Sequence, residues 1–286
     1  MNFRTDLALE AHKSNGGQTE GTVFESEKKG DLKISRLHIE SDSAAQKLEK
    51  PKGCYITIEG LPLTDYFRDA QEQIETISKE ITALLPEKGT VLVIGIGNTD
   101  ITPDALGPFS ADTVLATRHI RGEIARCAGL DNLRPTAVLS PGVLGQTGIE
   151  TGEIIISLLG RLEPCAVIAI DALASKSISH LGKTIQISDS GISPGSGIGN
   201  HRLRLNQETL GIPVIGIGMP TVVDAATLVS DMSGGEHTSF DRQNNFIVTP
   251  KEIDLLIERA SKLIGMAINC ALQPDYSFTD LAALVS

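Results

Sequence analysis

The sequence predicts a single α/β domain with a central, mostly parallel and twisted sheet, helices on both faces and a short hairpin-like edge near the N-terminus. Two apolar runs, 91–94 and 166–170, are rich in β-branched residues and typical of strands buried on both faces. The segments 65–85 and 249–272 carry apolar residues at helical spacing. Because strands and helices alternate along the chain, they favour a sheet with helices packed on it.

The first sixty residues are predicted to form an arm and an edge of the sheet. Residues 1–30 are dominated after position 11 by Gly, Glu, Lys, Ser and Thr. This composition leaves little to bury, so we expect a mobile arm or a loosely packed crossing. Residues 31–40 and 54–59 are predicted strands that together form the hairpin-like edge. The α/β domain then covers residues 31–286.

Helices and strands alternate from there to the C-terminus. The last helix is predicted to begin with a capping box, in which Thr249 is the N-cap, Pro250 the first residue and Glu252 the third. The remaining predicted elements are helices over residues 108–117, 151–162 and 221–230, and strands over residues 136–139, 184–187 and 213–217.

Composition argues against several classes of protein. The net charge of −11 disfavours a non-specific nucleic-acid binder, which needs a basic surface. No apolar run reaches the about 18 residues of a membrane span, and the N-terminus lacks the features of a signal peptide. None of the four cysteines forms a C-x-x-C pair, so we expect free, buried thiols in a reducing, cytoplasmic compartment.

Two carboxylates are predicted to meet at one edge of the sheet. Asp104 lies in the loop after the first apolar run, beyond a turn formed by Gly97 and Asn98, and Asp171 follows the second run. Sites in open α/β sheets collect beyond the carboxyl ends of the strands. Two acids held close divide general acid and general base work, because the charge of one raises the pKa of the other. Each acid taken alone is also explained as a helix cap or a turn former.

Three motifs of other enzyme classes are incomplete. Residues 95–97 begin a dinucleotide-binding turn, but Asp100 replaces its third glycine. Residues 182–184 end like a P-loop whose first glycine is missing. Residues 191–195 match G-x-S-x-G, yet Pro194 has no backbone N–H to offer an oxyanion hole.

The histidines do not form a metal-binding motif. None belongs to an H-E-x-x-H segment or to a pair spaced by four residues; the six are His12, His38, His119, His180, His201 and His237. We therefore assign no metal ligand and expect no cofactor. Two acids with one distant histidine remain a possible metal-binding set, so metal-dependent hydrolysis stays open as an alternative.

Seven segments of the chain resemble the germination proteases of spore-forming bacteria, also called spore proteases. The segments are long, follow the same order and cover nearly the whole chain, so the resemblance is specific. In chain order they are 5–10 (TDLALE), 97–98 (GN), 102–108 (TPDALGP), 148–151 (GIET), 170–174 (IDALA), 185–192 (IQISDSGI) and 221–225 (TVVDA).

The resemblance implies an endopeptidase of an atypical aspartic type that begins the degradation of small acid-soluble spore proteins during germination. It also implies a zymogen with a short N-terminal propeptide, a homotetramer, and a location in the forespore or spore core. The two carboxylates usually assigned to catalysis in this family match Asp104 and Asp171. We expect no direct contact with nucleic acid or membrane.

The N-terminal segment is similar to the sites that these enzymes cut, which have the form Thr-Glu-aromatic/aliphatic-Ala-Ser-Glu. By this likeness we predict self-cleavage between Asp6 and Leu7, with residues 1–6 as the propeptide. An acidic recognition site implies a basic pocket in the enzyme. Candidates, by proximity to the key loops, are Arg118, Arg202 and Arg204.

The chain departs from its presumed relatives in one loop and shares features with a second family. Between Asp224 and Thr249 it has a short polar loop where many germination proteases carry a long insertion. A more distant likeness is to hydrogenase maturation proteases, which share a Gly-x-Gly-Asn loop followed by an acid and a second strand-end Asp. Those proteins use a histidine toward nickel that we do not assign here.

The resulting hypothesis is hydrolysis of a peptide by a water molecule held between Asp104 and Asp171. One acid, ionised, takes a proton from the water, and the other, protonated, polarises the scissile carbonyl or protonates the leaving amine. The roles of the two are left open. The alternatives are a metal-dependent peptidase that uses the same acids, and a non-catalytic protein that binds a basic peptide or a cation in an acidic cleft.

Overall fold

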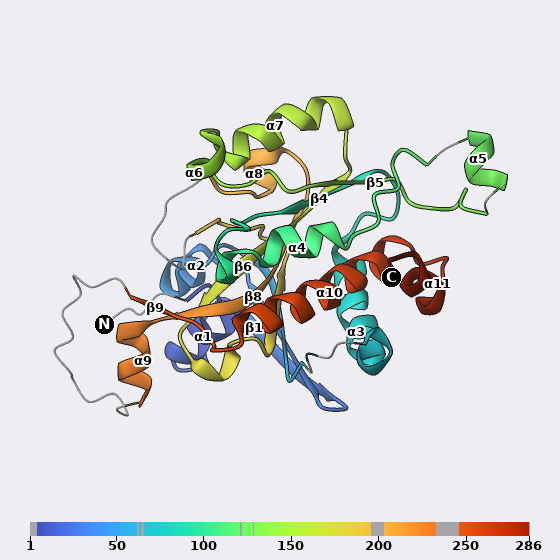
Figure 1. Cartoon of the computed structure of the whole chain (residues 1–286). Coiled ribbons are helices and arrows are strands. Elements are labelled where there is room, and N and C mark those ends of the chain that lie inside the picture. The colour runs from blue at the N-terminus through green and yellow to red at the C-terminus, as the bar shows by residue number, and fades with distance from the viewer. Residues whose placement is uncertain are drawn as a thin grey trace.

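The computed structural model describes residues 5–61, 63, 66–120, 122–127, 129–195, 203–232 and 246–285. This described part forms one mixed sheet with helices on both faces (Figure 1). The strand order is β1-β2-β3-β7-β8-β6-β4-β5, and β9 pairs with β8. The prediction of a single α/β domain with helices on both faces is confirmed.

The sheet is parallel in one half only. Strands β5, β4, β6 and β8 are mutually parallel, whereas all other pairs are antiparallel, so "mostly parallel" holds for that half alone. The strands are β1 (Thr22–Lys29), β2 (Leu32–Ile39), β3 (Gly53–Glu59), β4 (Val91–Gly95), β5 (Thr136–Leu139), β6 (Ala166–Ser175), β7 (Thr184–Ser188), β8 (Val214–Asp224) and β9 (Ile247–Val248).

The N-terminal segment differs from the expected mobile arm. Residues 22–29 form β1, which pairs with β2 along its whole length. Leu7, Ala8 and Leu9 are at most 1 % exposed, at the start of helix α1 (Ala8–Ser14). An edge strand is held by backbone hydrogen bonds and tolerates charged side chains. The polar composition of residues 22–29 therefore did not indicate a strand. The expected hairpin-like edge is present as β2 and β3, extended by β1.

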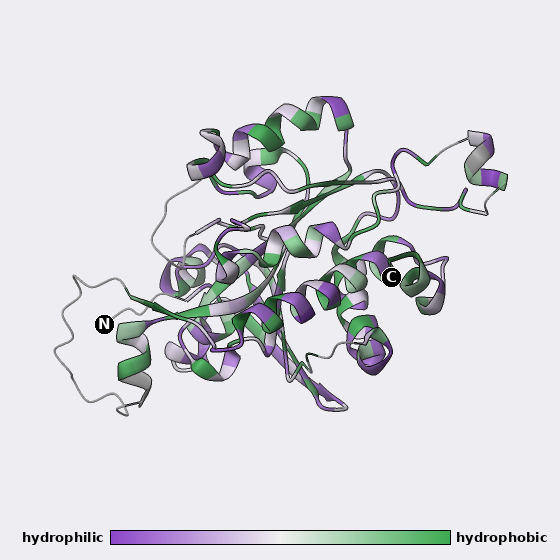
Figure 2. Cartoon of the chain, viewed as in Figure 1, coloured by the Kyte–Doolittle hydropathy of each residue, from purple (hydrophilic) through white to green (hydrophobic). Residues whose placement is uncertain are grey.

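Helices cover the two faces of the sheet, with apolar residues toward the strands and polar residues outward (Figure 2). One face packs against α3, α4 and α10, and the opposite face against α1, α2 and α7. The remaining helices and 3₁₀ turns lie in the connections between these elements, except α11, which follows α10. Bounds not yet given are α2 (Asp42–Leu48), η1 (Phe67–Ala70), α3 (Gln71–Leu84), η2 (Thr102–Asp104), α4 (Leu106–Asp112), α5 (Gly122–Cys127), α6 (Leu144–Thr147), α7 (Thr151–Leu162), η3 (Ile178–His180), α8 (Gln207–Leu210), α9 (Ala225–Met232), α10 (Ile253–Leu272) and α11 (Phe278–Val285).

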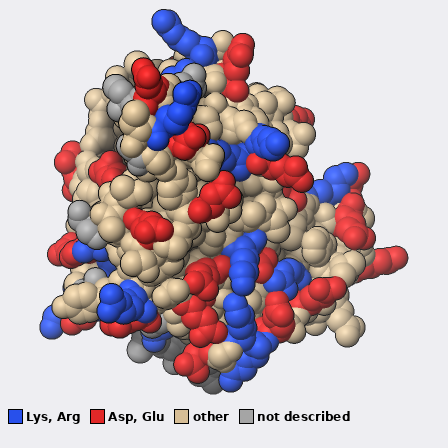
Figure 3. Space-filling view, turned by 90° about the vertical axis from the view of Figure 1, so that its right-hand side faces the viewer, with Lys and Arg blue, Asp and Glu red and all other residues tan. Residues whose placement is uncertain are grey.

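The core is aliphatic. Ile77 and Ile81 of α3 and Ile264 of α10 have no exposed surface, and each such side chain contributes about 1.5–3 kcal/mol of burial free energy. On the face shown in Figure 3, acidic and basic side chains are interspersed. Within the described part of the chain, no helix is long and apolar enough to cross a bilayer.

The start of the last helix differs from the prediction. Helix α10 begins at Ile253, and its N-cap Glu252 makes no side-chain capping bond. The Thr249 hydroxyl instead donates to the carbonyl oxygen of Thr221 at 2.9 Å. The predicted capping box is therefore wrong, because the Thr249 hydroxyl binds the backbone of β8 and does not cap the helix. Most of the predicted loop between Asp224 and Thr249 lies outside the described residues.

The cysteines are free thiols, as predicted, but only one of them is buried. Cys54 is buried, Cys165 and Cys270 are half-buried, and Cys127 is exposed. Burial raises the pKa of the Cys54 thiol to about 11. Cys127 lies on the short helix α5.

Helix α4 begins in direct contact with the backbone of the parallel strands. A Cβ atom on Gly107 would overlap the carbonyl oxygens of Ile96 and Ile170 and lie 2.6 Å from the nitrogen of Ile96. Only glycine permits this approach. This close approach brings the loop between β4 and α4 against Ile170 of β6. Asp171 is the next residue of that strand.

The substitution Gly107→Ala is expected to lower the free energy of unfolding by about 1–3 kcal/mol, because the overlapping atoms belong to backbone that has no rotamer to change. Denaturant unfolding measures the loss. The control is Gly160→Ala in α7. A Cβ atom added there would have no heavy atom within 4 Å apart from its own helix backbone, and alanine stabilises a helix by about 0.5–1 kcal/mol relative to glycine. Equal stabilities of the two variants would contradict the close packing of α4.

Candidate active site

A glycine turn and a backbone hydrogen bond hold Asp104 in place. The backbone N–H of Asn98 donates to Asp104 Oδ2 at 2.9 Å. Gly97 has a φ of +138°, and a Cβ there would overlap the carbonyl oxygen of Asp104. The loop that we predicted to shape the site, Gly97 and Asn98, thus lies directly against this carboxylate and its backbone.

Two further hydrogen bonds fix the Asp104 loop to other elements. The Thr221 hydroxyl of β8 donates to the carbonyl oxygen of Pro103 at 2.8 Å. The side-chain amide of Gln146, on α6, donates to Asn98 Oδ1 at 2.6 Å. The Asp104 loop is therefore also tied to β8 and α6.

Asp171 is the first residue of β6 that lies beyond the end of β4. The β4–β6 ladder ends with Gly95 opposite Ile170, and the Ile96 N–H donates to the Ile170 oxygen at 2.8 Å. Asp171 is 4 % exposed, and its Oδ1 accepts from the N–H of Ala172 at 2.9 Å. The chain leaves β4 for the Asp104 loop at this same level of β6.

The N-terminal segment occupies the next part of the same strand edge. The Asp6 N–H donates to the Ala174 oxygen at 2.9 Å, and the Ala174 N–H donates to Asp6 Oδ2 at 2.8 Å. Alternate residues of a strand direct their backbone groups to the same side. Ile170, Ala172 and Ala174 therefore line one edge of β6, with the Asp171 carboxylate bound beside Asp6. Ala172 and Ala174 are separated by roughly 7 Å of strand.

These contacts place the predicted cleavage site, Asp6 and Leu7, on the strand that carries Asp171. The edge of β6 meets the start of the Asp104 loop at Ile170, the Asp171 carboxylate at Ala172 and Asp6 at Ala174. Leu7, the next residue, is fully buried. Carboxylates next to a bound peptide can exchange protons with water and with the peptide nitrogen. Among the described residues, no three or more His, Cys, Asp or Glu side chains gather in a way that could hold a metal ion.

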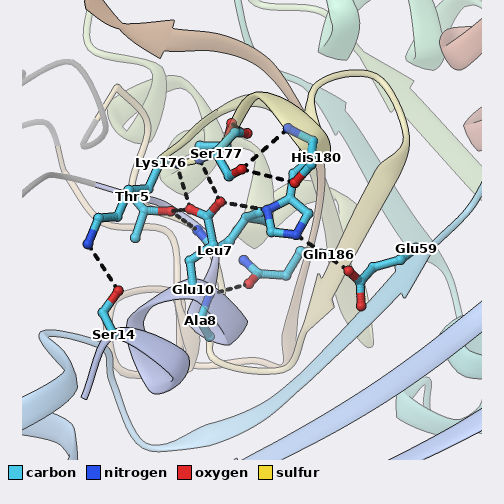
Figure 4. A network of polar contacts seen from close by, with 12 residues as sticks. Thr5, Leu7, Ala8, Glu10, Ser14, Glu59, Lys176, Ser177, His180 and Gln186 are labelled. Carbon is cyan, nitrogen blue, oxygen red and sulfur yellow. Dashed lines mark hydrogen bonds and ion pairs between the residues drawn. The ribbon is translucent and has the colours of Figure 1, made fainter. Parts of the chain in front are cut away.

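A buried network beyond Leu7 anchors helix α1 (Figure 4). Glu10 accepts from the backbone N–H groups of Lys176 at 2.7 Å and Ser177 at 3.0 Å, and it also binds the Thr5 hydroxyl. Its Oε1 lies 2.6 Å from His180 Nδ1, and His180 Nε2 lies 3.4 Å from an oxygen of Glu59. His180 thus bridges two carboxylates, one in α1 and one in β3.

The two carboxylates keep His180 charged. Hydrogen bonds to Glu10 and then Glu59 raise the pKa of His180 to about 9, against the opposing effect of burial. The hydrogen bond with His180 is the main cause that lowers the pKa of Glu59 to about 2. For Glu10, burial favours the neutral acid, but its hydrogen bonds with His180, Thr5 and Lys176 outweigh it and lower the pKa. Near neutral pH the three groups form a charged, mutually stabilised cluster.

The basic groups near Asp6 differ from those expected. Of the three candidate arginines, Arg204 is half-buried, and its Nε has no hydrogen-bond partner in the described part of the chain. Arg118 is half-buried, and Arg202 lies outside the described residues. The cation that contacts the segment is Lys50, whose Nζ donates to the Thr5 oxygen at 2.7 Å.

The sequence analysis missed Lys50, Gln186 and the Glu10–His180 pair. Gln186 carried a usable signal, because it interrupts the apolar residues Ile185 and Ile187 in a strand that is buried on both faces. A polar side chain in such a position needs hydrogen-bond partners. Lys50 follows a short helix and has no local pattern that marks it.

The variant His180→Gln is expected to be less stable than the wild type by on the order of 3 kcal/mol, the free energy that corresponds to a pKa raised from 6.5 to about 9. The raised pKa of His180 stabilises the folded state fully below pH 6.5, and this stabilisation is lost as the pH rises through 9. The lowered pKa of Glu59 contributes above pH 4.5 and is lost as the pH falls through 2.

The difference in Tm between this variant and the wild type should therefore be largest between pH 4.5 and 6.5 and small at pH 10. The exposed His119 gives the control His119→Gln, which should match the wild type at every pH. A Tm difference for His180→Gln that does not change from pH 5 to pH 10 would contradict the charged cluster.

Comparisons with known proteins agree with the resemblance seen in the sequence. A solved structure, the [NiFe] hydrogenase maturation protease HycI of Thermococcus kodakarensis, matches 66 % of this chain and 98 % of its own, with 18 % identity and a TM-score of 0.38. That TM-score is too low for the likeness to bear on fold or function.

The sequence relatives are much closer. The germination protease of Clostridium perfringens is 40 % identical over 98 % of both chains, and that of Caldanaerobacter subterraneus is 39 % identical over 100 % of this chain and 98 % of its own. The germination protease of Priestia megaterium is 42 % identical over 80 % of this chain and 65 % of its own. The family model of the germination proteases matches residues 4–234. The chain therefore belongs to the germination protease family and is a protease of spore germination.

Proposed function

We propose that this protein is an endopeptidase that begins the degradation of small acid-soluble spore proteins, and that it cleaves its own Asp6–Leu7 bond. The observation that carries the proposal is the shared edge of β6, where the Asp171 carboxylate lies between the Asp104 loop and the bound residue Asp6. A second extended peptide placed on this edge would meet the same two acids. By family, we extend the proposal to a homotetramer located in the spore core.

The proposed reaction uses water and the two aspartates without a covalent intermediate. The ionised acid takes a proton from water as the water oxygen adds to the carbonyl carbon of residue 6. The bond from that carbon to the nitrogen of residue 7 then breaks, and the protonated acid gives its proton to the leaving nitrogen. The products are a carboxylate on residue 6 and a free amine on residue 7.

Asp104→Asn and Asp171→Asn are each expected to reduce cleavage of a Thr-Glu-Phe-Ala-Ser-Glu peptide by about 10²–10⁴-fold, because an amide cannot carry the proton in either role. The rate is measured by chromatography, with the Tm of each variant as the check of folding. The control is Asp112→Asn at the exposed end of α4, which should cleave at the wild-type rate.

Full activity in either of the two active-site variants would refute the aspartate mechanism. Exhaustive chelation of the wild type separates the metal-dependent alternative, since activity lost and then restored by one metal would favour it. An intact peptide after long incubation with the wild type would favour a protein that only binds.

Self-cleavage is expected to remove residues 1–6 and leave Leu7 as the new N-terminus. Because the segment is docked on the β6 strand of its own chain, the reaction should be first order and its rate constant independent of protein concentration. Mass spectrometry of the incubated full chain measures both the product and the rate. Asp171→Asn should stay at full length, and a cut at another bond in the wild type would contradict the proposal.

A further inference from the structure

We infer that the side-chain amide of Gln186 binds the carbonyl oxygen of the scissile Asp6–Leu7 bond and stabilises the negative charge that forms on it during hydrolysis. The inference rests on the cleavage proposed above and adds a catalytic residue to it. In the reaction proposed above the protonated aspartate serves the leaving nitrogen, and the structure places a separate donor, Gln186, on the carbonyl oxygen.

One amide holds the backbone on both sides of Leu7. Gln186 Oε1 accepts from the Ala8 N–H at 2.7 Å (Figure 4). Gln186 Nε2 donates to the Asp6 oxygen at 3.1 Å. Gln186 is 8 % exposed and Leu7 is fully buried. The Asp6 oxygen belongs to the bond that we propose is cut, so the contact is with the reacting group itself.

Glutamine is the residue type that this position needs. The carbonyl oxygen of Asp6 can only accept a hydrogen bond and the Ala8 N–H can only donate one, so the two partners fix which end of the amide carries the nitrogen. An ionised glutamate would satisfy Ala8 but have no proton for Asp6. A methionine would satisfy neither.

Gln186 also lies on the same face of the sheet as Asp171. In the strand register Asp171 is opposite Gly218 on β8, and Gly218 is opposite Gln186 on β7. Residues opposite one another in a sheet direct their side chains to the same face. The carboxylate and the amide therefore approach the segment from one side, from strands separated only by β8.

The residues upstream of the bond are held as well. Lys50 Nζ donates to the Thr5 oxygen, and the Asp6 N–H and carboxylate are bound to the backbone of Ala174. Burial lowers the pKa of Lys50, and the charge of Asp6 partly opposes this effect. These contacts hold the Asp6 carbonyl next to Gln186.

The chemical role follows from the electron count. When the water oxygen adds to the Asp6 carbonyl carbon, the π electron pair moves onto the carbonyl oxygen, which becomes an oxyanion 3.1 Å or less from the Gln186 donor. When the carbon–nitrogen bond breaks, that pair returns and the Leu7 nitrogen receives a proton from the protonated aspartate. Gln186 exchanges no proton, and a single donor of this kind contributes about 10²–10³ in rate.

The same donor becomes available to other substrates after processing. Release of residues 1–6 removes the Asp6 oxygen from Nε2, while the bond from the Ala8 N–H to Oε1 belongs to the part of the chain that remains. The amide is then held in the same orientation with a free donor. A substrate peptide on the β6 edge presents its own scissile carbonyl to it.

The test compares Gln186→Glu with Gln186→Met in the full chain, using the rate of self-cleavage followed by mass spectrometry. Both variants lack the donor at pH 7 and are expected to process about 10²–10³-fold more slowly than the wild type. Gln186→Glu keeps the acceptor for the Ala8 N–H, and the Tm of both variants, measured at each pH, is the check of folding. The control Gln46→Glu adds the same charge to the exposed face of α2 and should process normally.

The rates of the two variants at acid pH distinguish a hydrogen-bond donor at position 186 from a side chain that only supports the structure. A protonated glutamate can donate to the Asp6 oxygen, so the rate of Gln186→Glu relative to the wild type should recover as the pH is lowered, whereas that of Gln186→Met should not. Processing of Gln186→Glu at the wild-type rate at pH 7, or no relative recovery at acid pH, would overturn the inference. A wild type that does not cut at Asp6–Leu7 would instead refute the proposed function.

Discussion

The site depends on the unequal lengths of two neighbouring parallel strands. Strand β4 ends at Gly95, opposite Ile170, whereas β6 continues to Ser175. Backbone N–H and C=O groups on a buried strand edge must find partners. Beyond the end of β4, that edge is completed by the Asp171 carboxylate and by residue 6 of the same chain. An unfilled place in the sheet thus becomes a place that takes an extended peptide.

The acids reach this edge because glycine allows the backbone to approach closely. Gly97 and Gly107 occupy positions where a side chain would overlap the Asp104 and Ile170 oxygens. Neither acid requires a long or flexible loop, and the contacts of Asn98 and Thr221 restrict the Asp104 turn further. Reacting groups fixed in this way need little further ordering before reaction, which is a main source of rate enhancement.

The bond between Asp6 and Leu7 is held from both ends, and the two anchors differ in kind. On one side, Lys50 and Ala174 bind the backbone of Thr5 and the backbone and carboxylate of Asp6. On the other side, Glu10 lies in a charged cluster with His180. Under the proposed cleavage, the first anchor would leave with residues 1–6, and the second would keep helix α1 on the sheet.

The sequence by itself determined the elements with strong local signals: the apolar strands β4 and β6, the helix at residues 151–162, and the loop that carries Asp104. Periodicity, glycine and proline are local properties, so these could be predicted. The structure of residues 5–29, the position of Thr249, and the partners of Lys50, Gln186 and Glu10 were decided only by tertiary structure. Gln186 contacts Ala8 across 178 residues of sequence, and hydrogen bonds over such separations depend on strand register, which no local pattern encodes.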